Sequence, residues 1–251
     1  MPLSDFKDQS IWIIGASSGI GAALARELSA RGAKIFLSAR QEGKLQSLAR
    51  ELGPDHQSLP LDAAQPGAIA AAFTTISTRK IDRVIYLAAT YEPGKISAMD
   101  MDHARQMIAV NLTGALEMLH TILPVMEAKG HGQIALCGSV AGYTGLPGGQ
   151  PYSATKAAII NLAESLHAEM KSKNIDVKLI SPGFVETPMT DKNNFDMPAI
   201  ISPESAARYI AQGLQSKTFE IHFPKKFTFF MKLLRILPYG LRLWLTGNIR
   251  P

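Results

Sequence analysis

Cysteine is almost absent from this 251-residue chain, in which Cys137 is the single example. One thiol excludes an intrachain disulfide and cannot form a thiolate cluster around a metal, so we expect no metal site. Cys137 lies in an apolar stretch. This setting predicts an inert, buried thiol.

Acidic residues are absent after Glu220, whereas six basic side chains follow it: Lys225, Lys226, Lys232, Arg235, Arg242 and Arg250. The net charge is +5, but residues 1–220 carry 20 basic and 21 acidic side chains. The basic character therefore belongs to the C-terminal tail. Its cations alternate with Phe, Leu and Trp instead of covering a polar face, which argues against a nucleic-acid-binding fold.

Charged residues are few, at 19%, and hydrophobic residues make up 46% of the chain, which excludes a disordered protein. Long hydrophobic runs near the start are also missing. The first one, at 11–14, is too short for a signal peptide, so we expect a cytoplasmic protein. Strand and helix patterns alternate almost from end to end, without internal repeats, and predict one α/β domain.

A glycine-rich turn is the first motif. A predicted strand at 10–16 leads into Gly15-Ala16-Ser17-Ser18-Gly19-Ile20-Gly21, and a predicted helix at about 20–30 ends before Gly32. A strand, a glycine turn and a helix form the setting in which a dinucleotide pyrophosphate binds at a helix N-terminus. The spacing is G-x-x-x-G-x-G, and a plain strand-to-helix turn is the alternative.

The end of the second predicted strand, at 34–38, bears on the choice of cofactor. An acidic residue there would bind the ribose hydroxyls of NAD, but residues 38–40 are Ser-Ala-Arg. The guanidinium of Arg40 suits a 2′-phosphate, which favours NADP(H) over NAD(H). Alternatively, Arg40 only starts a helix at 41–52. Asp62 follows a predicted strand at 57–61, where it would accept the adenine amino group or cap the next helix.

Tyr152 and Lys156 form a Y-x-x-x-K motif at the start of a predicted helix at 152–171. Residues four apart share one helix face, and an ammonium group there would lower the phenol pKa from about 10. Such a tyrosine can exchange a proton with a carbonyl or carbinol oxygen. The alternative is an ordinary half-buried aromatic ring beside a solvated lysine.

Further strands are predicted at 83–88, 133–138, 177–180 and 218–223, and further helices at 66–78, 100–129 and 203–214, with Ser202 as the cap of the last helix. Ser139 directly follows the strand at 133–138. Ligands bind at the carboxyl ends of parallel strands, so Ser139 should share a crevice with the glycine turn. Asn111 lies within the helix at 100–129, where an asparagine is usually a packing residue.

Together these motifs resemble those of the short-chain dehydrogenase/reductase family, over residues 8–223. The matching residues are Gly15, Gly19, Gly21, Asn111, Ser139, Tyr152, Lys156, Pro182, Gly183 and Thr187. The resemblance implies a doubly wound Rossmann fold, with a seven-stranded, mostly parallel sheet and helices on both faces. It also implies a homodimer or homotetramer.

The resemblance implies a role for each matching residue. Tyr152 would be the general acid/base, and Lys156 would lower its pKa and hold the nicotinamide ribose. Ser139 would polarise the substrate carbonyl, and Asn111 would support a water in a proton relay. The implied cofactor-binding set is Gly15, Ser17, Ser18, Gly19, Ile20, Gly21, Arg40, Asp62, Ala88, Tyr152, Lys156, Pro182, Gly183 and Thr187, with Thr187 bonding the nicotinamide carboxamide.

The chain departs from the family pattern at two positions. Ile14 replaces the usual threonine, and Leu87-Ala88-Ala89-Thr90 replaces Asn-Asn-Ala-Gly. The second change removes hydrogen bonds that brace the central sheet and the adenosine ribose. No catalytic group is lost.

Two apolar segments complete the chain. The segment at 184–200 contains Phe184, Val185, Met189, Phe195 and Met197, which predicts a substrate lid. The tail at 225–245 mixes Phe, Leu and Trp with cations, and Pro238 interrupts it before about 20 apolar residues accumulate, so it should not span a membrane. It is either an interfacial helix pair on an anionic membrane or a flap on the substrate pocket or a partner subunit.

Two function classes remain. The first is an NADP(H)-dependent oxidoreductase acting on a carbonyl or secondary alcohol, with apolar compounds favoured by the lid and the tail. The second is a catalytically idle NADP-binding sensor or scaffold. An idle protein would be free to lose Asn111, Ser139, Tyr152 or Lys156, and the chain has all four. The sequence therefore favours the enzyme and leaves its individual substrate open.

Overall fold

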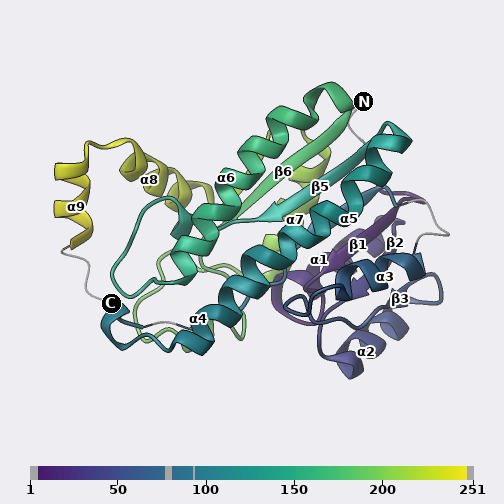
Figure 1. The fold of residues 1–251 in the computed structure, drawn as a ribbon, viewed down its shortest axis with the longest axis horizontal. Helices are drawn as coiled ribbons and strands as arrows, with labels where there is room; N and C mark the ends of the chain where they lie inside the picture. Colours follow the sequence, from purple (N-terminus) through teal and green to yellow (C-terminus); the bar gives the residue numbers. More distant parts are fainter. Residues whose placement is uncertain (1–4, 77–80, 93, 248–251) are drawn as a thin grey trace.

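The computed structural model describes residues 5–76, 81–92 and 94–247, which contain one seven-stranded sheet (Figure 1). The strands are β1 (Ser10–Ile14), β2 (Lys34–Ser38), β3 (Gln57–Ser58), β4 (Arg83–Tyr86), β5 (Gly132–Cys137), β6 (Ile175–Pro182) and β7 (Glu220–Phe223). Their order is β3-β2-β1-β4-β5-β6-β7, and every neighbouring pair is parallel. The predicted doubly wound α/β fold is confirmed.

Helices cover both faces of the sheet. They are α1 (Gly19–Ala30), α2 (Glu42–Leu52), α3 (Ala68–Ile76), α4 (Met101–Ile108), α5 (Gly114–Lys129), α6 (Tyr152–Met170), α7 (Pro203–Gln215), α8 (Lys225–Ile236) and α9 (Tyr239–Gly247). Side chains alternate between the two faces of a strand. In β1, Ile11 and Ile13 therefore pack with α1, α2 and α7, whereas Trp12 and Ile14 pack with α3, α5 and α6.

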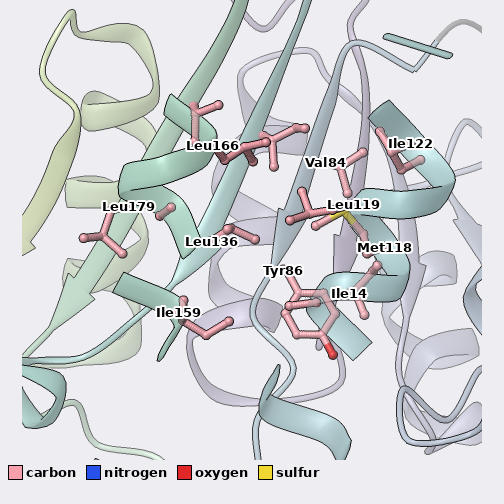
Figure 2. Packing of buried hydrophobic residues seen from close by; sticks show 14 of the residues in the cluster. Ile14, Val84, Tyr86, Met118, Leu119, Ile122, Leu136, Ile159, Leu166 and Leu179 are labelled. Atoms are coloured by element: carbon pink, nitrogen blue, oxygen red, sulfur yellow. The ribbon is translucent and has the colours of Figure 1, made fainter. Parts of the chain in front are cut away.

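Figure 2 shows the core between the sheet and helices α3, α5 and α6. Strand residues Ile14, Val84, Tyr86, Leu136 and Leu179 meet Met118, Leu119 and Ile122 of α5 and Ile159 and Leu166 of α6. The central strands are buried on both faces, which explains why they are apolar throughout. The two layers hold the carboxyl ends of the strands in fixed positions.

Several element bounds differ from the predicted ones. The strands predicted at 10–16, 57–61 and 83–88 end earlier, at Ile14, Ser58 and Tyr86, because the chain there leaves the sheet to line the cleft described below. The strand predicted at 177–180 is longer, since it pairs with β5 and β7 along both edges. The helix predicted at 66–78 begins after Gly67, whose φ is +78°, and residues 77–78 lie outside the described ranges.

The cap predicted for α7 is confirmed. Ser202 Oγ accepts the Ser205 N–H at 3.2 Å, and Pro203 occupies the first position of the helix. This arrangement satisfies one of the free amides of the first turn and fixes the start of the helix.

The helix predicted at 100–129 is interrupted by a π-helical turn, Ala109–Thr113, between α4 and α5. Tyr86 donates its hydroxyl to the Val110 carbonyl within this turn, at 2.6 Å. A Cβ on Gly114 would lie 2.3 Å from that same hydroxyl oxygen, so glycine is required there. Single π turns in helices are often found at functional sites, and this one contains Asn111.

By length and composition alone, Met101–Lys129 is the one helical run in the described part of the chain that could cross a bilayer. In this fold one side of the run packs into the core. Met118, Ile122 and Met126 on α5 are buried against the sheet. Buried helices of soluble proteins commonly pass the same test.

Candidate active site

All the residues predicted to bind the cofactor line one cleft of about 320 Å³. The cleft lies at the carboxyl ends of the strands, where the order reverses between β1 and β4. This reversal is the position at which open parallel sheets bind their ligands. Residues spread from Gly15 to Thr187 in the sequence are therefore brought together by the sheet topology.

The glycine turn fits tightly between other backbone segments. Gly15 has a φ of +102°, and a Cβ there would lie 2.5 Å from the Ala88 nitrogen. A Cβ on Gly19 would lie 2.8 Å from Cγ2 of Thr187. Ser18, the N-cap of α1, makes no side-chain hydrogen bond to the helix. The first amides of α1 thus remain free to bind an anion such as a pyrophosphate.

Arg40 and Asp62 line the cleft from the loops that follow β2 and β3. Arg40 is exposed and has no ion pair among the described residues. It lies two residues before α2, which begins at Glu42, close to the predicted helix start at residue 41. Asp62 accepts the Ala64 N–H at 2.9 Å and does not cap α3, which begins at Ala68.

Tyr152 and Lys156 occupy the first two turns of α6. Lys156 is only 1% exposed, so the alternative of a solvated lysine is wrong. Its Nζ lies 5.5 Å from the centre of the Tyr152 ring and donates a hydrogen bond to the Cys137 carbonyl at 2.8 Å. Cys137 itself lines the cleft and is half-buried, not fully buried as predicted, and burial raises the pKa of its thiol.

Burial determines the protonation of this pair. It raises the pKa of Tyr152 above the ordinary value of a phenol, and the neighbouring Ser139 hydroxyl only partly opposes the shift. Burial likewise lowers the pKa of Lys156. Burial therefore outweighs the expected lowering of the Tyr152 pKa by Lys156, because desolvation disfavours the charged form of both groups. Tyr152 is a neutral phenol near pH 7 and is suited to donate a proton.

Asn111 is buried and makes three hydrogen bonds. Its Oδ1 accepts the Thr90 N–H at 2.7 Å, and its Nδ2 donates to the Thr90 carbonyl at 3.0 Å and to Thr155 Oγ1 at 3.1 Å. It thus connects the loop after β4 with α6. This is the loop in which the family's two asparagines are missing, so Asn111 supplies a brace at that position.

A second cavity, of about 1150 Å³, lies on the other side of Tyr152. Ser139, Tyr152, Gly183, Met189 and Thr190 line both cavities. The other walls are mainly apolar and come from the segment at 184–200, α8 and the loop before α6: Leu146, Phe184, Phe195, Phe227, Phe230, Met231 and Leu234. Ser139 and Tyr152 therefore stand where a nucleotide-sized cleft meets a large apolar cavity.

The inner side of the tail is packed on this site. A Cβ on Gly183 would lie 2.9 Å from the Phe227 ring, and the ring centres of Phe184 and Phe227 are 5.5 Å apart. Phe195 in turn packs at 6.0 Å from Phe184. The inner side of α8 thus covers the large apolar cavity, in the place that the flap interpretation of the tail predicts.

Residues 9–198 match the family model of the short chain dehydrogenases. The chain belongs to this family. An uncharacterized oxidoreductase of Myxococcus xanthus is 28% identical over 241 residues, which cover 94% of this chain and 95% of that protein. The 3-oxoacyl-[acyl-carrier-protein] reductase FabG of Escherichia coli is 32% identical over 188 residues, or 74% of this chain and 77% of that protein.

A solved structure agrees with this assignment. A short-chain dehydrogenase from Sphingobium yanoikuyae, in complex with NADPH, superposes with a TM-score of 0.82 at 25% identity. The superposition covers 96% of each chain.

Sequence reasoning missed Tyr91 in this short-chain dehydrogenase. Its ring meets that of Tyr152 edge-on, with centres 4.9 Å apart, and its hydroxyl donates to Asn193 Oδ1 at 2.9 Å. Lys192 adds a hydrogen bond to the Tyr91 carbonyl at 3.0 Å and an ion pair with Glu92 at 2.6 Å. The loop after β4 thus holds the segment at 184–200 over the site. The strand-end rule that identified Ser139 would also have identified this loop.

Replacing Asn111 by alanine tests whether its hydrogen bonds to Thr90 and Thr155 stabilise the fold. The variant leaves the Thr90 N–H without its acceptor, so we expect a loss of about 1–3 kcal/mol in the free energy of unfolding, together with slower turnover. Urea unfolding and steady-state rates measure the two effects. Asn161→Ala makes the same substitution on the exposed face of α6 and is the matched control, which should change the stability far less. Equal stability of N111A and the parent would contradict the bracing role.

Proposed function

We propose that the protein is an NADP(H)-dependent oxidoreductase that transfers a hydride between nicotinamide and a carbonyl or secondary alcohol, with Tyr152 as the general acid/base. The observation that carries the proposal is the position of Ser139 and Tyr152 on the boundary shared by the two cavities. A hydride donor in the smaller cleft and a carbonyl carbon in the larger cavity would meet beside these two hydroxyls.

The roles of the residues follow from their surroundings. Bound NADPH would supply the hydride. Ser139 would donate a hydrogen bond to the substrate carbonyl, and the neutral phenol of Tyr152 would give its proton to the oxygen as negative charge develops there. Lys156, fixed by the Cys137 carbonyl, would place a positive charge beside the Tyr152 ring and stabilise the phenolate left behind.

The preference for NADP(H) is supported by Arg40, an exposed cation on the cleft whose guanidinium has no carboxylate partner among the described residues. A 2′-phosphate is the group that such a guanidinium binds best. The NADPH in the Sphingobium relative is consistent with this choice. The size of the second cavity and its Phe and Met walls favour bulky apolar ketones or alcohols as substrates.

A carbonyl screen tests the proposal. The purified protein is given aldehydes and ketones of increasing apolar bulk, with NADPH or NADH, and nicotinamide absorbance is followed. We expect NADPH to be consumed fastest with bulky apolar ketones and NADH to be used more slowly. If NADPH binds in calorimetry but no compound of the panel is turned over in either direction, the idle NADP-binding protein becomes the better interpretation.

A further inference from the structure

Helices α8 and α9 follow the edge strand β7 and form one end of the long axis of the molecule (Figure 1). In the described part of the chain, eight of the fourteen exposed large hydrophobic residues lie on these two helices. We name them the tail face: Phe229, Phe230, Leu233, Ile236, Tyr239, Leu241, Leu243 and Trp244, with exposed fractions from 47% to 76%. Such a concentration marks an interaction surface.

Helix α8 has two different sides. Its inner side buries Met231 and Leu234 in the core, and two polar contacts fasten it: Thr228 Oγ1 to His222 Nδ1 at 2.6 Å, and Lys232 Nζ to Glu220 at 2.5 Å. The outer side carries Phe229, Leu233 and Ile236, which are spaced i, i+4, i+7 and thus form one stripe. The inner side alone fastens the helix to the domain, so the outer stripe stays exposed and is available to bind a partner.

The charge on this segment points to the nature of that partner. Helices α8 and α9 carry five basic residues and no acidic residue. Lys225 and Lys226 are exposed and make no ion pair with any residue that the structure describes. Large apolar side chains flanked by cations match a surface in which anionic headgroups lie above acyl chains.

A second copy of the chain fits less well. In a symmetric dimer the same patch meets itself, so Lys225 and Lys226 of the two tails, which have no ion pair among the described residues, would approach each other. Like charges in such a contact oppose association. The tail face is therefore better matched to an anionic surface than to itself.

We propose that the tail face docks the protein on an anionic lipid bilayer, with α8 and α9 lying in the interface. The helices have 12 and 9 residues, fewer than the roughly 20 that a spanning helix needs. Phe230 belongs to the tail face and also lines the large cavity, so the cavity adjoins the docked surface. Apolar substrates would then enter from the bilayer, a step that rests on the function proposed above.

Vesicle co-sedimentation of the full chain, without cofactor or substrate, tests the docking. We expect binding to phosphatidylcholine vesicles that contain phosphatidylserine, little binding to phosphatidylcholine alone, and a decrease with added salt. The double variant Phe229→Glu, Leu233→Glu should lose about tenfold or more in vesicle affinity. Lys225→Gln, Lys226→Gln should lose roughly 10- to 30-fold. Val125→Glu, which introduces a glutamate at an exposed apolar residue of α5 outside the tail face, should bind like the parent.

Circular dichroism and turnover of a short water-soluble ketone establish that each variant is folded and active. Phe229 and Leu233 do not line the cavity, so the variant should turn over this ketone as fast as the parent. If the parent does not turn over the ketone at all, that result counts against the proposed oxidoreductase function and not against the docking. No sedimentation of the folded parent with anionic vesicles at low salt would overturn the docking. Equal vesicle binding by the parent and F229E/L233E would also overturn the docking. So would the finding that the parent is a dimer, that F229E/L233E is a monomer, and that both bind vesicles with the same affinity.

Discussion

Replacement of Tyr152 by phenylalanine should lower turnover by about 100- to 10,000-fold and leave NADPH binding nearly unchanged. The phenyl ring keeps its edge-on contact with Tyr91 and its place beside Lys156. The hydroxyl that would protonate the substrate oxygen is lost. Steady-state rates measure the first effect, and a fluorescence titration with NADPH measures the second.

The pH dependence of turnover by the parent protein is a second test of Tyr152 as the acid/base. The pKa of Tyr152 is raised, so its phenol should stay protonated beyond about pH 10, and carbonyl reduction should not lose its proton donor below that pH. Alcohol oxidation needs the deprotonated form and should accelerate as the pH rises. Both dependences on this group should vanish in Y152F.

Tyr91→Phe is the matched control, since it removes a phenolic hydroxyl from the neighbouring ring and breaks its contact with Asn193. Its effect on turnover should be far smaller than that of Y152F. Rates of Y152F within about threefold of the parent would remove Tyr152 from the role of acid/base.

Replacement of Arg40 by aspartate should weaken NADPH binding by about 100-fold. The change removes a charge-assisted hydrogen-bond partner, worth about 1.5–3 kcal/mol, and adds a charge of the same sign as the 2′-phosphate. NADH lacks this phosphate, so its affinity should change much less. Calorimetric titration with both cofactors measures the ratio.

Arg50→Asp provides the control for Arg40, because it makes the same charge change on α2 at a residue that does not line the cleft. It should leave the ratio of NADPH to NADH affinity as in the parent. If R40D weakens both cofactors to the same degree, or if the parent already prefers NADH, Arg40 does not select the cofactor.

The local signals in the sequence were reliable because each depends on neighbours in the chain. Continuous apolar runs predicted β1, β2 and β4, and the strand-end rule placed Ser139 in one cleft with the glycine turn that begins at Gly15. The four-residue spacing of Tyr152 and Lys156 was enough to place both on one face of α6. Such patterns predicted one α/β domain and the position of the cleft, whereas the doubly wound fold and the full set of site residues, Thr187 among them, came from the resemblance to a known family.

Only the tertiary structure decided how those groups behave. The burial of Lys156 and the raised pKa of Tyr152 depend on what surrounds α6, which no spacing in the motif encodes. Asn111 meets Thr155 across 44 residues, and Tyr91 meets Asn193 across 102. The two sides of α8 likewise differ only through packing, because one side contacts β7 and lines the cavity and the other is exposed. Contacts between distant segments depend on packing of the whole chain, and a sequence pattern records only near neighbours.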